Sequence, residues 1–453
     1  MLWNQWAIPV AGTKMRQPAY ASGRVGVWLI RSIARGGVPC CEGYLPGRFL
    51  GGVAALTLAI ALANRPVHLP PPKSPAEECQ RINDGPFDQG WDEQARLRKR
   101  WIEVCRQAAA SDPVNLHWKH VLARALTADG HHEEAIVLWR ELAAQNDAGA
   151  AFEIYDLYKS YYRDDVNKPQ LVKRAEAEAG LRKAAELGDS YATLMLTVLL
   201  DRGDTVKRDP EDALHWAGRA LANPAKDQTR GQMQVLLGRL LVKSANPEQK
   251  ARGLDLLERL AQAGNASGKT QLAIAIRAGD PTRARQLLEQ SLSADAGGAV
   301  PPLADMLIKG EGGPADPQRA VSLLTGWRAR DVPAVRGALG LLYIEGKVVP
   351  RDVKRGVDLL HYWAVWNYDA RLKMIKVLTE NPELTIDRPE HVLYDLTEEA
   401  ELGEPGALDA LIEIKLSQSA QFQDKAGGCA LAARAAKNGD AYAAQRLKEC
   451  GGT

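Results

Sequence analysis

A recurring pattern of helix-forming sequence constrains this chain most strongly. Apolar runs close on a glycine at 200–203, 307–310 and 343–346, and the starts of these runs differ by 107 and 36 residues. Weaker anchors divide the remainder into steps of 41, 35, 31 and 35 residues, and they stand at Leu241, Ile276 and Leu378. A self-similar period of this length is typical of stacked helix-turn-helix arrays. We therefore predict an all-α fold, a right-handed solenoid of stacked antiparallel helix pairs, over residues 114–453 in about eight units.

Turn residues mark where the helices of each unit end and begin. The second helices of several units stop at a glycine followed by Asp or Asn, at Gly188, Gly264 and Gly439. Glycine adopts the left-handed conformation that terminates a helix, and Asp or Asn caps the next one. Asp209-Pro210 and Asp316-Pro317 place a cap before a proline in the first turn, where its missing N–H is harmless.

Two stretches carry a family resemblance. Arg336–Gly346 reads RGALGLLYIEG, and Glu211–Ala220 reads EDALHWAGRA. The chain resembles the Sel-one-like subclass of the tetratricopeptide-repeat superfamily from about residue 114 to 450, although 268–293 is short and 369–402 lacks the loop glycine. The resemblance implies a non-enzymatic solenoid that holds partner proteins, as members of this class do in polysaccharide secretion and its regulation.

A leader precedes the repeats. Arg48 is followed by fifteen uncharged residues, 49–63, that end in Ala61-x-Ala63. A basic flank, a short apolar stretch and small residues are typical of a secretory signal, with cleavage before Asn64. We predict a leader over 1–63, a Pro-rich linker over 64–78 and a periplasmic location. The alternative is an uncleaved signal anchor that holds the chain on the inner membrane, facing the periplasm.

Four cysteines flank the helical region. Cys79 and Cys105 lie in a predicted N-terminal helical cap, 79–113, and Cys429 and Cys450 lie at the far end. In an oxidising compartment each pair could form a disulfide that stabilises a terminal unit; the alternative is four buried free thiols. The cap resembles that of exported alphaproteobacterial proteins of this repeat class, with the two cysteines at matching places.

The charge balance argues against nucleic acid as a partner. Residues 1–48 carry six bases and one acid, which leaves 52 bases against 55 acids from residue 49 onward. The body therefore lacks the basic excess that favours binding to nucleic acid or anionic lipid. We predict membrane contact only through an uncleaved leader.

Motifs that suggest chemistry are better explained as repeat structure. Residues 263–270 fit a relaxed phosphate-loop pattern, but such a loop needs a preceding strand, and a helical pattern precedes this one. The adjacent His131 and His132 point about 100° apart on a helix and cannot both face one ion. We predict no cofactor, no metal site and no catalytic residue.

Two aromatic runs are candidate binding surfaces, because Tyr and Trp are enriched at binding hot spots. The alternative is that these rings pack between repeats. The candidate partner-binding residues are Tyr158, Tyr161, Tyr362, Trp363, Trp366 and Tyr368. We predict a periplasmic adaptor that holds partner proteins in an envelope or exopolysaccharide system; the alternative function is a carbohydrate- or peptidoglycan-binding module.

Overall fold

The structure is a computed structural model, and it describes residues 74–85, 91–164, 171–203, 205–222, 229–293, 297–326, 331–365 and 367–451. The predicted leader, 1–63, lies outside the described residues, as does the linker as far as residue 73. No helix within the described ranges is both long enough and apolar enough to cross a bilayer.

The described residues begin with a two-helix cap. Ser74 caps α3 (Pro75–Asp84), which starts four residues before the predicted cap boundary, and α4 is Trp91–Ser111. The structure joins Cys79 on α3 to Cys105 on α4, with 4.9 Å between their Cα atoms. This is one of the two predicted disulfides.

Among the described residues, seven antiparallel helix pairs follow the cap, each packed on the next. They are α5 (Leu116–Ala128) with α6 (His132–Ala144), α7 (Ala148–Asp164) with α8 (Arg174–Glu186), α9 (Ser190–Arg202) with α10 (Pro210–Ala222), α11 (Thr229–Lys243) with α12 (Pro247–Gln262), α13 (Ala266–Ile276) with α14 (Pro281–Ser293), α15 (Val300–Lys309) with α16 (Pro317–Thr325), and α17 (Pro333–Glu345) with α18 (Val353–Ala364). A short 3-10 helix, Gly297–Ala299, leads into α15. The predicted solenoid of helix pairs is confirmed.

The predicted turn chemistry places the helix ends. At the α12–α13 junction Gly264 has φ +84°, and the Asn265 side chain accepts a 2.7 Å hydrogen bond from the amide of Gly268. The 263–270 stretch is therefore a helix-turn-helix, as interpreted from the sequence, and it has no preceding strand. The loops after α9, α15 and α17 share one geometry, in which a left-handed glycine ends the first helix and an Asp six residues later caps the second.

The pairing becomes irregular after α18. The remaining helices are α19 (Tyr368–Glu380), α20 (Pro389–Leu402), α21 (Ala407–Leu416), α22 (Lys425–Lys437) and α23 (Ala441–Glu449). Helix α21 packs on both α19 and α20, and α22 then packs on α21 and α23. The structure joins Cys429 to Cys450 across α22 and the end of α23, with 5.8 Å between Cα atoms. The irregular unit coincides with 369–402, where the sequence lacks the loop glycine.

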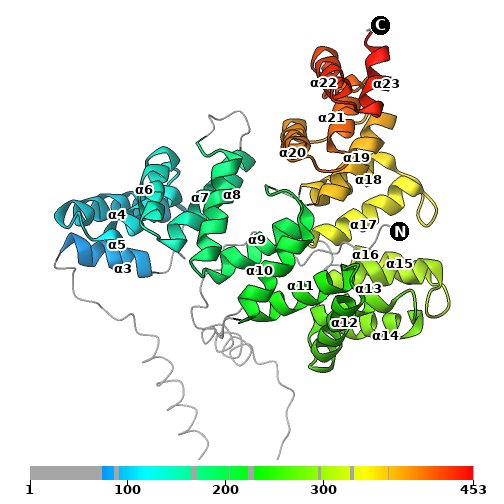
Figure 1. Cartoon of the computed structure of the whole chain (residues 1–453), viewed down its shortest axis with the longest axis horizontal. Helices are drawn as coiled ribbons and strands as arrows, with labels where there is room; N and C mark the ends of the chain where they lie inside the picture. The colour runs from blue at the N-terminus through cyan, green and yellow to red at the C-terminus, as the bar shows by residue number, and fades with distance from the viewer. Residues whose placement is uncertain are drawn as a thin grey trace, which may run out of the picture.

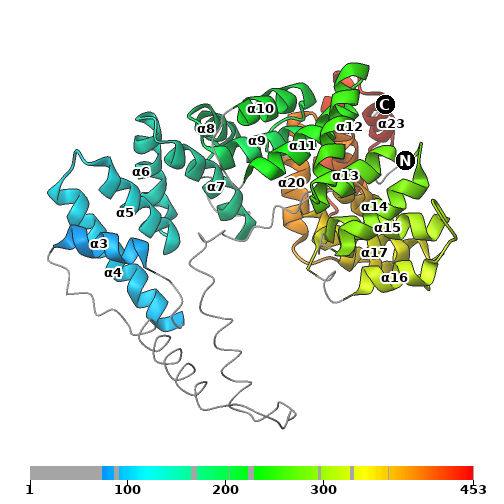
Figure 2. The same ribbon diagram turned by 90° about the horizontal axis from the view of Figure 1, so that it is seen from below.

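The stack curves until its distant parts meet. Glu398 of α20 (orange in Figures 1 and 2) contacts Tyr158 of α7 and Arg174 of α8, although eleven α-helices separate α8 from α20 along the chain. The hydrophobic core runs along the stack in two main clusters, and Tyr394 of α20 packs against the N-terminal one. This return of α20 is the feature of the fold that the period of the repeats does not encode.

Candidate interaction surface

Glycines let α17 and α18 approach at backbone distance. A Cβ atom on Gly340 would lie 2.6 Å from the Gly356 carbonyl oxygen, and one on Gly356 would lie 2.7 Å from the Gly340 carbonyl oxygen. Glycine inside a helix costs about 0.5–1 kcal/mol relative to alanine. Here the missing side chains permit a close contact that no other residue allows.

Trp363 packs into this contact. A Cβ on Gly337 would overlap the Trp363 ring, and Trp363 is only 8% exposed. The ring fills space that glycine leaves on the neighbouring helix. Trp363 is therefore a core residue, which corrects its assignment to a partner-binding surface.

Two of the predicted tyrosines are also buried. The Tyr368 hydroxyl donates a 2.7 Å hydrogen bond to the Pro405 carbonyl oxygen, and Asn367 caps α19 beside it. The Tyr158 hydroxyl donates a 2.7 Å hydrogen bond to Glu398. Burial, followed by neighbouring carboxylates, raises the pKa of both phenols, so both remain protonated donors. Each hydroxyl is bonded within the chain, so neither tyrosine belongs to an exposed surface in this structure.

Two other candidates cannot be placed. Trp366 lies outside the described residues, and so does the side chain of Tyr161, although its backbone belongs to α7. Nothing in the structure bears on a binding role for either.

Tyr362 is the predicted binding residue that the structure leaves on the surface, at 41% exposure. The Arg336 guanidinium carbon lies 4.1 Å from the centre of its ring, and Arg355 lies 4.4 Å from the ring of Tyr343. Such stacking of a cation on an aromatic face is attractive by about 0.5–1 kcal/mol at exposed sites. The two pairs hold two tyrosines and two arginines in fixed positions.

Helix geometry explains why these pairs share a face. Arg336 and Tyr343 are seven residues apart on α17, and Arg355 and Tyr362 are seven apart on α18. Seven residues are about two helical turns, so each pair lies on one side of its helix. Because the helices are antiparallel, arginine meets tyrosine at both ends. This double spacing was visible in the sequence and would have identified Arg336, Tyr343 and Arg355, which the reading of aromatic runs missed.

The two arginines keep their hydrogen-bonding edges free. Neither Arg336 nor Arg355 has a carboxylate partner among the described residues, whereas Arg106, Arg140, Arg283 and Arg319 each have one. Burial, above all, lowers the pKa of the neighbouring His361, so this side chain is neutral at pH 7 and adds no positive charge. Val365, 39% exposed, follows Tyr362 by three residues, a spacing that places neighbours on one side of a helix. We call this set the Arg–Tyr surface: Arg336, Tyr343, Arg355, Tyr362 and Val365.

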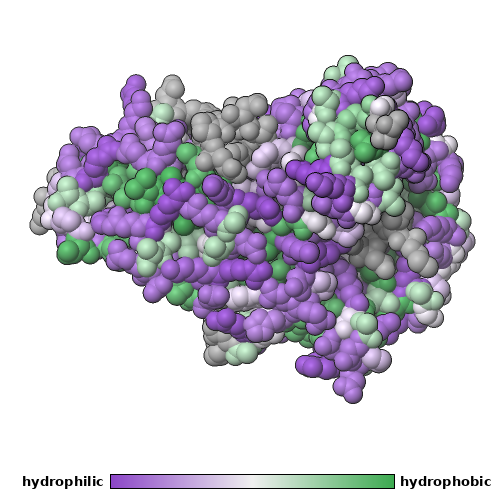
Figure 3. Space-filling model, turned by 45° about the horizontal axis from the view of Figure 1, so that its top comes forward, coloured by the Kyte–Doolittle hydropathy of each residue, from purple (hydrophilic) through white to green (hydrophobic). Residues whose placement is uncertain are grey.

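Exposed hydrophobic residues alone do not select a site. Figure 3 shows them in separate patches on a mostly hydrophilic face, which is ordinary for a soluble surface. Tyr191 on α9 is 39% exposed, a fraction similar to that of Tyr362. Its ring contacts Phe152, however, and no arginine is stacked on it. The fixed, unpaired arginines distinguish the Arg–Tyr surface.

Buried ion pairs join the first helices of successive units. Asp201 of α9 accepts from Arg239 of α11 at 2.6 Å and from Lys243 at 3.0 Å. Three units after Asp201, Asp305 of α15 accepts from Arg277 at 2.5 Å and from Lys309 at 2.8 Å. These contacts fix α9 against α11 and the end of α13 against α15.

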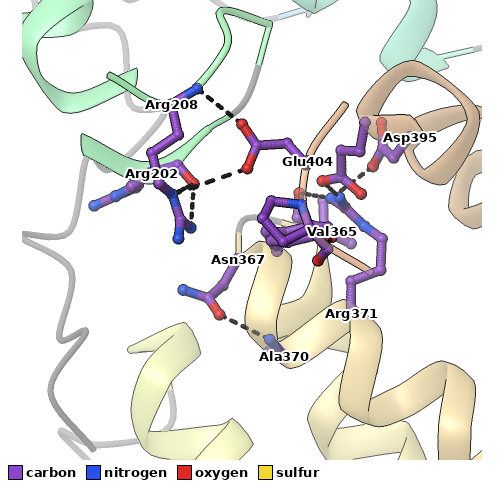
Figure 4. Close-up of polar contacts among 11 residues, drawn as sticks. Arg202, Arg208, Val365, Asn367, Ala370, Arg371, Asp395 and Glu404 are labelled. Atoms are coloured by element: carbon purple, nitrogen blue, oxygen red, sulfur yellow. Dashed lines mark hydrogen bonds and ion pairs between the residues drawn. The ribbon is translucent and has the colours of Figure 1, made fainter. Parts of the chain in front are cut away.

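A third group of polar contacts brings α20 and the segment after it against α7–α10. Glu398 accepts from Tyr158, and its Oε2 lies 3.1 Å from Arg174 Nε. Glu404, whose side chain is 1% exposed, accepts a 2.8 Å hydrogen bond from the backbone amide of Arg208 (Figure 4). We call this set the closing contact: Tyr158, Arg174 and Arg208 on one side, and Glu398, Glu401 and Glu404 on the other.

The scattered histidines serve the fold. His117 Nε2 lies 2.7 Å from Gln80 Oε1, and His120 Nδ1 lies 2.8 Å from Asp147 Oδ2. His131 precedes α6, and His132 begins it. Within the described part of the chain, no three His, Cys, Asp or Glu residues are grouped as metal ligands would be.

Comparison with known proteins gives structural likenesses. No family model matches the chain, and no curated protein matches it. A Sel1 repeat protein from Oxalobacter formigenes is 22% identical, with 78% of this chain and 98% of that one covered and a TM-score of 0.36. The protective antigen c5321 of uropathogenic Escherichia coli, which displays an SLR fold, is 18% identical, with 87% and 81% covered and a TM-score of 0.40. Yeast Tom70 is 12% identical, with 95% and 79% covered and a TM-score of 0.37.

Proposed function

We propose that this chain is a non-enzymatic scaffold that binds a partner protein through the Arg–Tyr surface on α17 and α18. The observation that carries the proposal is the pair of arginines, each stacked on a tyrosine and neither paired with a carboxylate among the described residues. Stacking restrains the guanidinium groups, so less side-chain freedom is lost when they bind. Their free N–H edges match a carboxylate in a bidentate arrangement.

The residue types of this surface fit protein recognition. Tyr and Arg are enriched at binding hot spots, where truncation of one side chain costs about 2 kcal/mol or more. Arg336 and Arg355 lie at opposite ends of the α17–α18 pair, so a partner that contacts both spans the length of these helices. The glycine contacts between α17 and α18, with Trp363 packed on Gly337, hold this surface in one conformation, which reduces the cost of binding.

We further propose that the chain acts in the periplasm, in an envelope or exopolysaccharide system. The two disulfides support an oxidising compartment, since such bonds are rare where thiols are kept reduced. The leader read from the sequence supports the same location, but the envelope role itself is an analogy with the repeat class. A fusion at the C-terminus to a reporter active only outside the cytoplasm tests the location: activity that disappears on deletion of 49–63 supports it, and a cytoplasmic full-length chain contradicts it.

Affinity capture with matched variants tests the binding role. The full chain, crosslinked in envelope fractions, should capture a discrete protein that Tyr362→Ala and Arg336→Ala lose. Tyr191→Ala is the control, because Tyr191 is a tyrosine of similar exposure on another unit. The proposal predicts that this control captures the same protein as the parent chain.

Three outcomes contradict the proposal. Equal capture by Tyr362→Ala and the parent chain would mean that the partner binds elsewhere. Capture that Tyr191→Ala also loses would indicate a general defect. Retention of the chain on purified peptidoglycan or exopolysaccharide, lost with Tyr362→Ala while no protein is captured, would favour the carbohydrate-binding alternative.

A further inference from the structure

Gly203 and Arg208, in the loop after α9, contact the Glu404 carboxylate, and we call the space that it fills the recess. Gly203 has φ +72°, and its amide donates to Leu199 to end the helix. The Arg208 guanidinium donates to the Arg202 carbonyl oxygen through Nη2 at 2.6 Å and Nε at 3.1 Å, which folds the side chain back over the loop. None of these contacts involves α20.

Glu404 occupies this recess from a distant part of the chain. It accepts from the Arg208 amide at 2.8 Å, and its second oxygen lies 4.0 Å from Arg208 Nε. A Cβ on Gly203 would overlap the Glu404 carboxylate, so only glycine leaves room for it. Figure 4 shows Glu404 entering between Arg202 and Arg208.

The sister loops show that this occupancy is particular to α9. In the α15 loop the atoms nearest to a Cβ on Gly310 belong to Ala315, and in the α17 loop those nearest to Gly346 belong to Arg351. Ala315 and Arg351 hold the place of Arg208, five residues after the glycine. Those loops fill the space themselves, whereas the α9 loop leaves it to a carboxylate from elsewhere.

Positive charge lies near the recess. The pKa of Lys243 is lowered, first by burial and then by the charge of Arg239. The charge of Arg208 also lowers the pKa of Lys243, so these three cations act on one another. Asp201 neutralises part of this charge from within the same unit. The environment therefore favours a carboxylate, whatever its origin.

The acidic side of the closing contact has a simple pattern. Glu398, Glu401 and Glu404 are spaced by three residues along α20 and the turn after it. Glu398 meets Arg174 and Tyr158, and Glu401 Oε2 lies 3.8 Å from Arg174 Nη2. Arg174 and Glu401 are partly exposed, and exposed ion pairs contribute about 0–1 kcal/mol and weaken with salt. The Arg174–Glu401 pair is therefore the weakest part of the closing contact, whereas Glu398 and Glu404 are 18% and 1% exposed.

We propose that Tyr158, Arg174 and Arg208 form a binding site for an acidic helical segment of a partner protein, which α20 occupies within the free chain. An incoming segment with glutamates three residues apart would replace Glu398 and Glu404 and release α20 from α7–α10. The inference rests on the proposed protein-binding role but uses residues separate from the Arg–Tyr surface.

A peptide with the sequence of residues 389–406 tests the site directly. Fluorescence anisotropy measures its binding to the full chain and to Glu398→Gln/Glu404→Gln, in which the internal occupant is weakened. Apparent affinity scales with the fraction of chains whose site is open. If α20 occupies the site in nine chains out of ten, the double variant should bind the peptide about tenfold more tightly than the parent chain.

Substitutions on the basic side separate this site from a general anion effect. In the double-variant background, Arg174→Ala/Arg208→Ala should lose at least tenfold in affinity for the peptide. Arg351→Ala, the equivalent loop position between α17 and α18, should change nothing, and neither should Tyr362→Ala. Helical circular dichroism and melting temperature, measured for every variant, show that each is folded.

Each of several results would overturn the proposal. These are equal peptide affinity of the parent chain and the folded double variant, no binding at millimolar peptide, equal binding of a peptide with glutamine at all three glutamate positions, and equal competition by heparin. A negative result in the peptide assay would not affect the capture of a partner through Tyr362. A negative result in the capture experiment would likewise not affect the peptide assay, so the two proposals can be rejected separately.

Discussion

The hydroxyl of Tyr158 donates a 2.7 Å hydrogen bond to Glu398, a residue 240 positions later in the chain. A solenoid built only from neighbour contacts has no such link, because each repeat touches those beside it. Here α20 leaves the regular stack and returns to α7. The curvature of the intervening units brings the two together, and Tyr394 of α20 adds a ring beside the bond.

Removal of this hydroxyl should loosen the closing contact. Tyr158→Phe should cost about 1 kcal/mol of stability, the net value of a typical hydrogen bond. It should also raise the radius of gyration in 0.5 M salt, measured by small-angle X-ray scattering. Tyr442→Phe is the control, because the Tyr442 hydroxyl bonds Glu413 within adjacent helices. A radius unchanged in Tyr158→Phe, or raised equally in both, would contradict a role in closure.

Trp363 and Tyr362 should respond differently to truncation. Trp363→Ala removes a buried ring packed on Gly337 and should cost about 3–5 kcal/mol of folding stability. Tyr362→Ala removes an exposed ring and its cation–π contact with Arg336. Apart from the loss of that contact, it should cost less than about 1 kcal/mol of folding stability. Urea denaturation followed by circular dichroism measures both. Equal losses would mean that Tyr362 also belongs to the core.

The Asp201–Arg239 pair should make stability depend on pH. Although burial alone would raise the pKa of Asp201, Arg239 and Lys243 lower it overall. The stabilisation is therefore full above the unfolded pKa of about 3.9 and is lost as pH falls through the lower folded value. Asp201→Asn, which leaves Arg239 without its charge partner, should cost about 3–5 kcal/mol at pH 7 and progressively less as the pH falls below about 4.

An exposed pair provides the control for that experiment. Asp255 and Arg259 form an ion pair in which both side chains are well exposed, so Asp255→Asn should change stability by less than about 1 kcal/mol at any pH. A cost for Asp201→Asn that does not vary with pH would show that the loss arises from packing and not from the carboxylate charge.

The two disulfides should stabilise the ends of the stack. Cys429→Ser/Cys450→Ser should cost about 3 kcal/mol, as expected for a loop of this size, and should increase hydrogen exchange in α22 and α23. The parent chain treated with reductant should reproduce the variant. Non-reducing peptide mapping should link Cys79 to Cys105 and Cys429 to Cys450. Free alkylation of all four thiols in exported, unreduced protein would refute both bonds.

The sequence predicted the repeat fold because its signals are local. Gly264 and Asn265 end and start helices through contacts within a few residues, and the period follows from repeating them. The aromatic runs were less informative. Trp363 looks like a surplus aromatic until Gly337, on the neighbouring helix, is seen to make room for its ring.

The closing contact could not be predicted from the pattern. Whether Glu404 meets Arg208 depends on the summed rotation of every unit between α10 and α19, and small differences per unit accumulate. The sequence did mark the irregular unit, 369–402, by its missing loop glycine. The missing glycine indicated where α20 leaves the regular stack, but not which helices α20 packs against.

Site-specific photo-crosslinking tests the central claim most directly. A photoreactive residue placed at Val365, within the Arg–Tyr surface, should form a discrete adduct with one partner protein in cells. The same residue placed at Val137, an exposed valine of α6, should not. Arg336→Ala in the Val365 background should abolish the adduct. Adducts of equal yield at both positions, or an adduct at Val365 that Arg336→Ala does not weaken, would contradict binding through the Arg–Tyr surface.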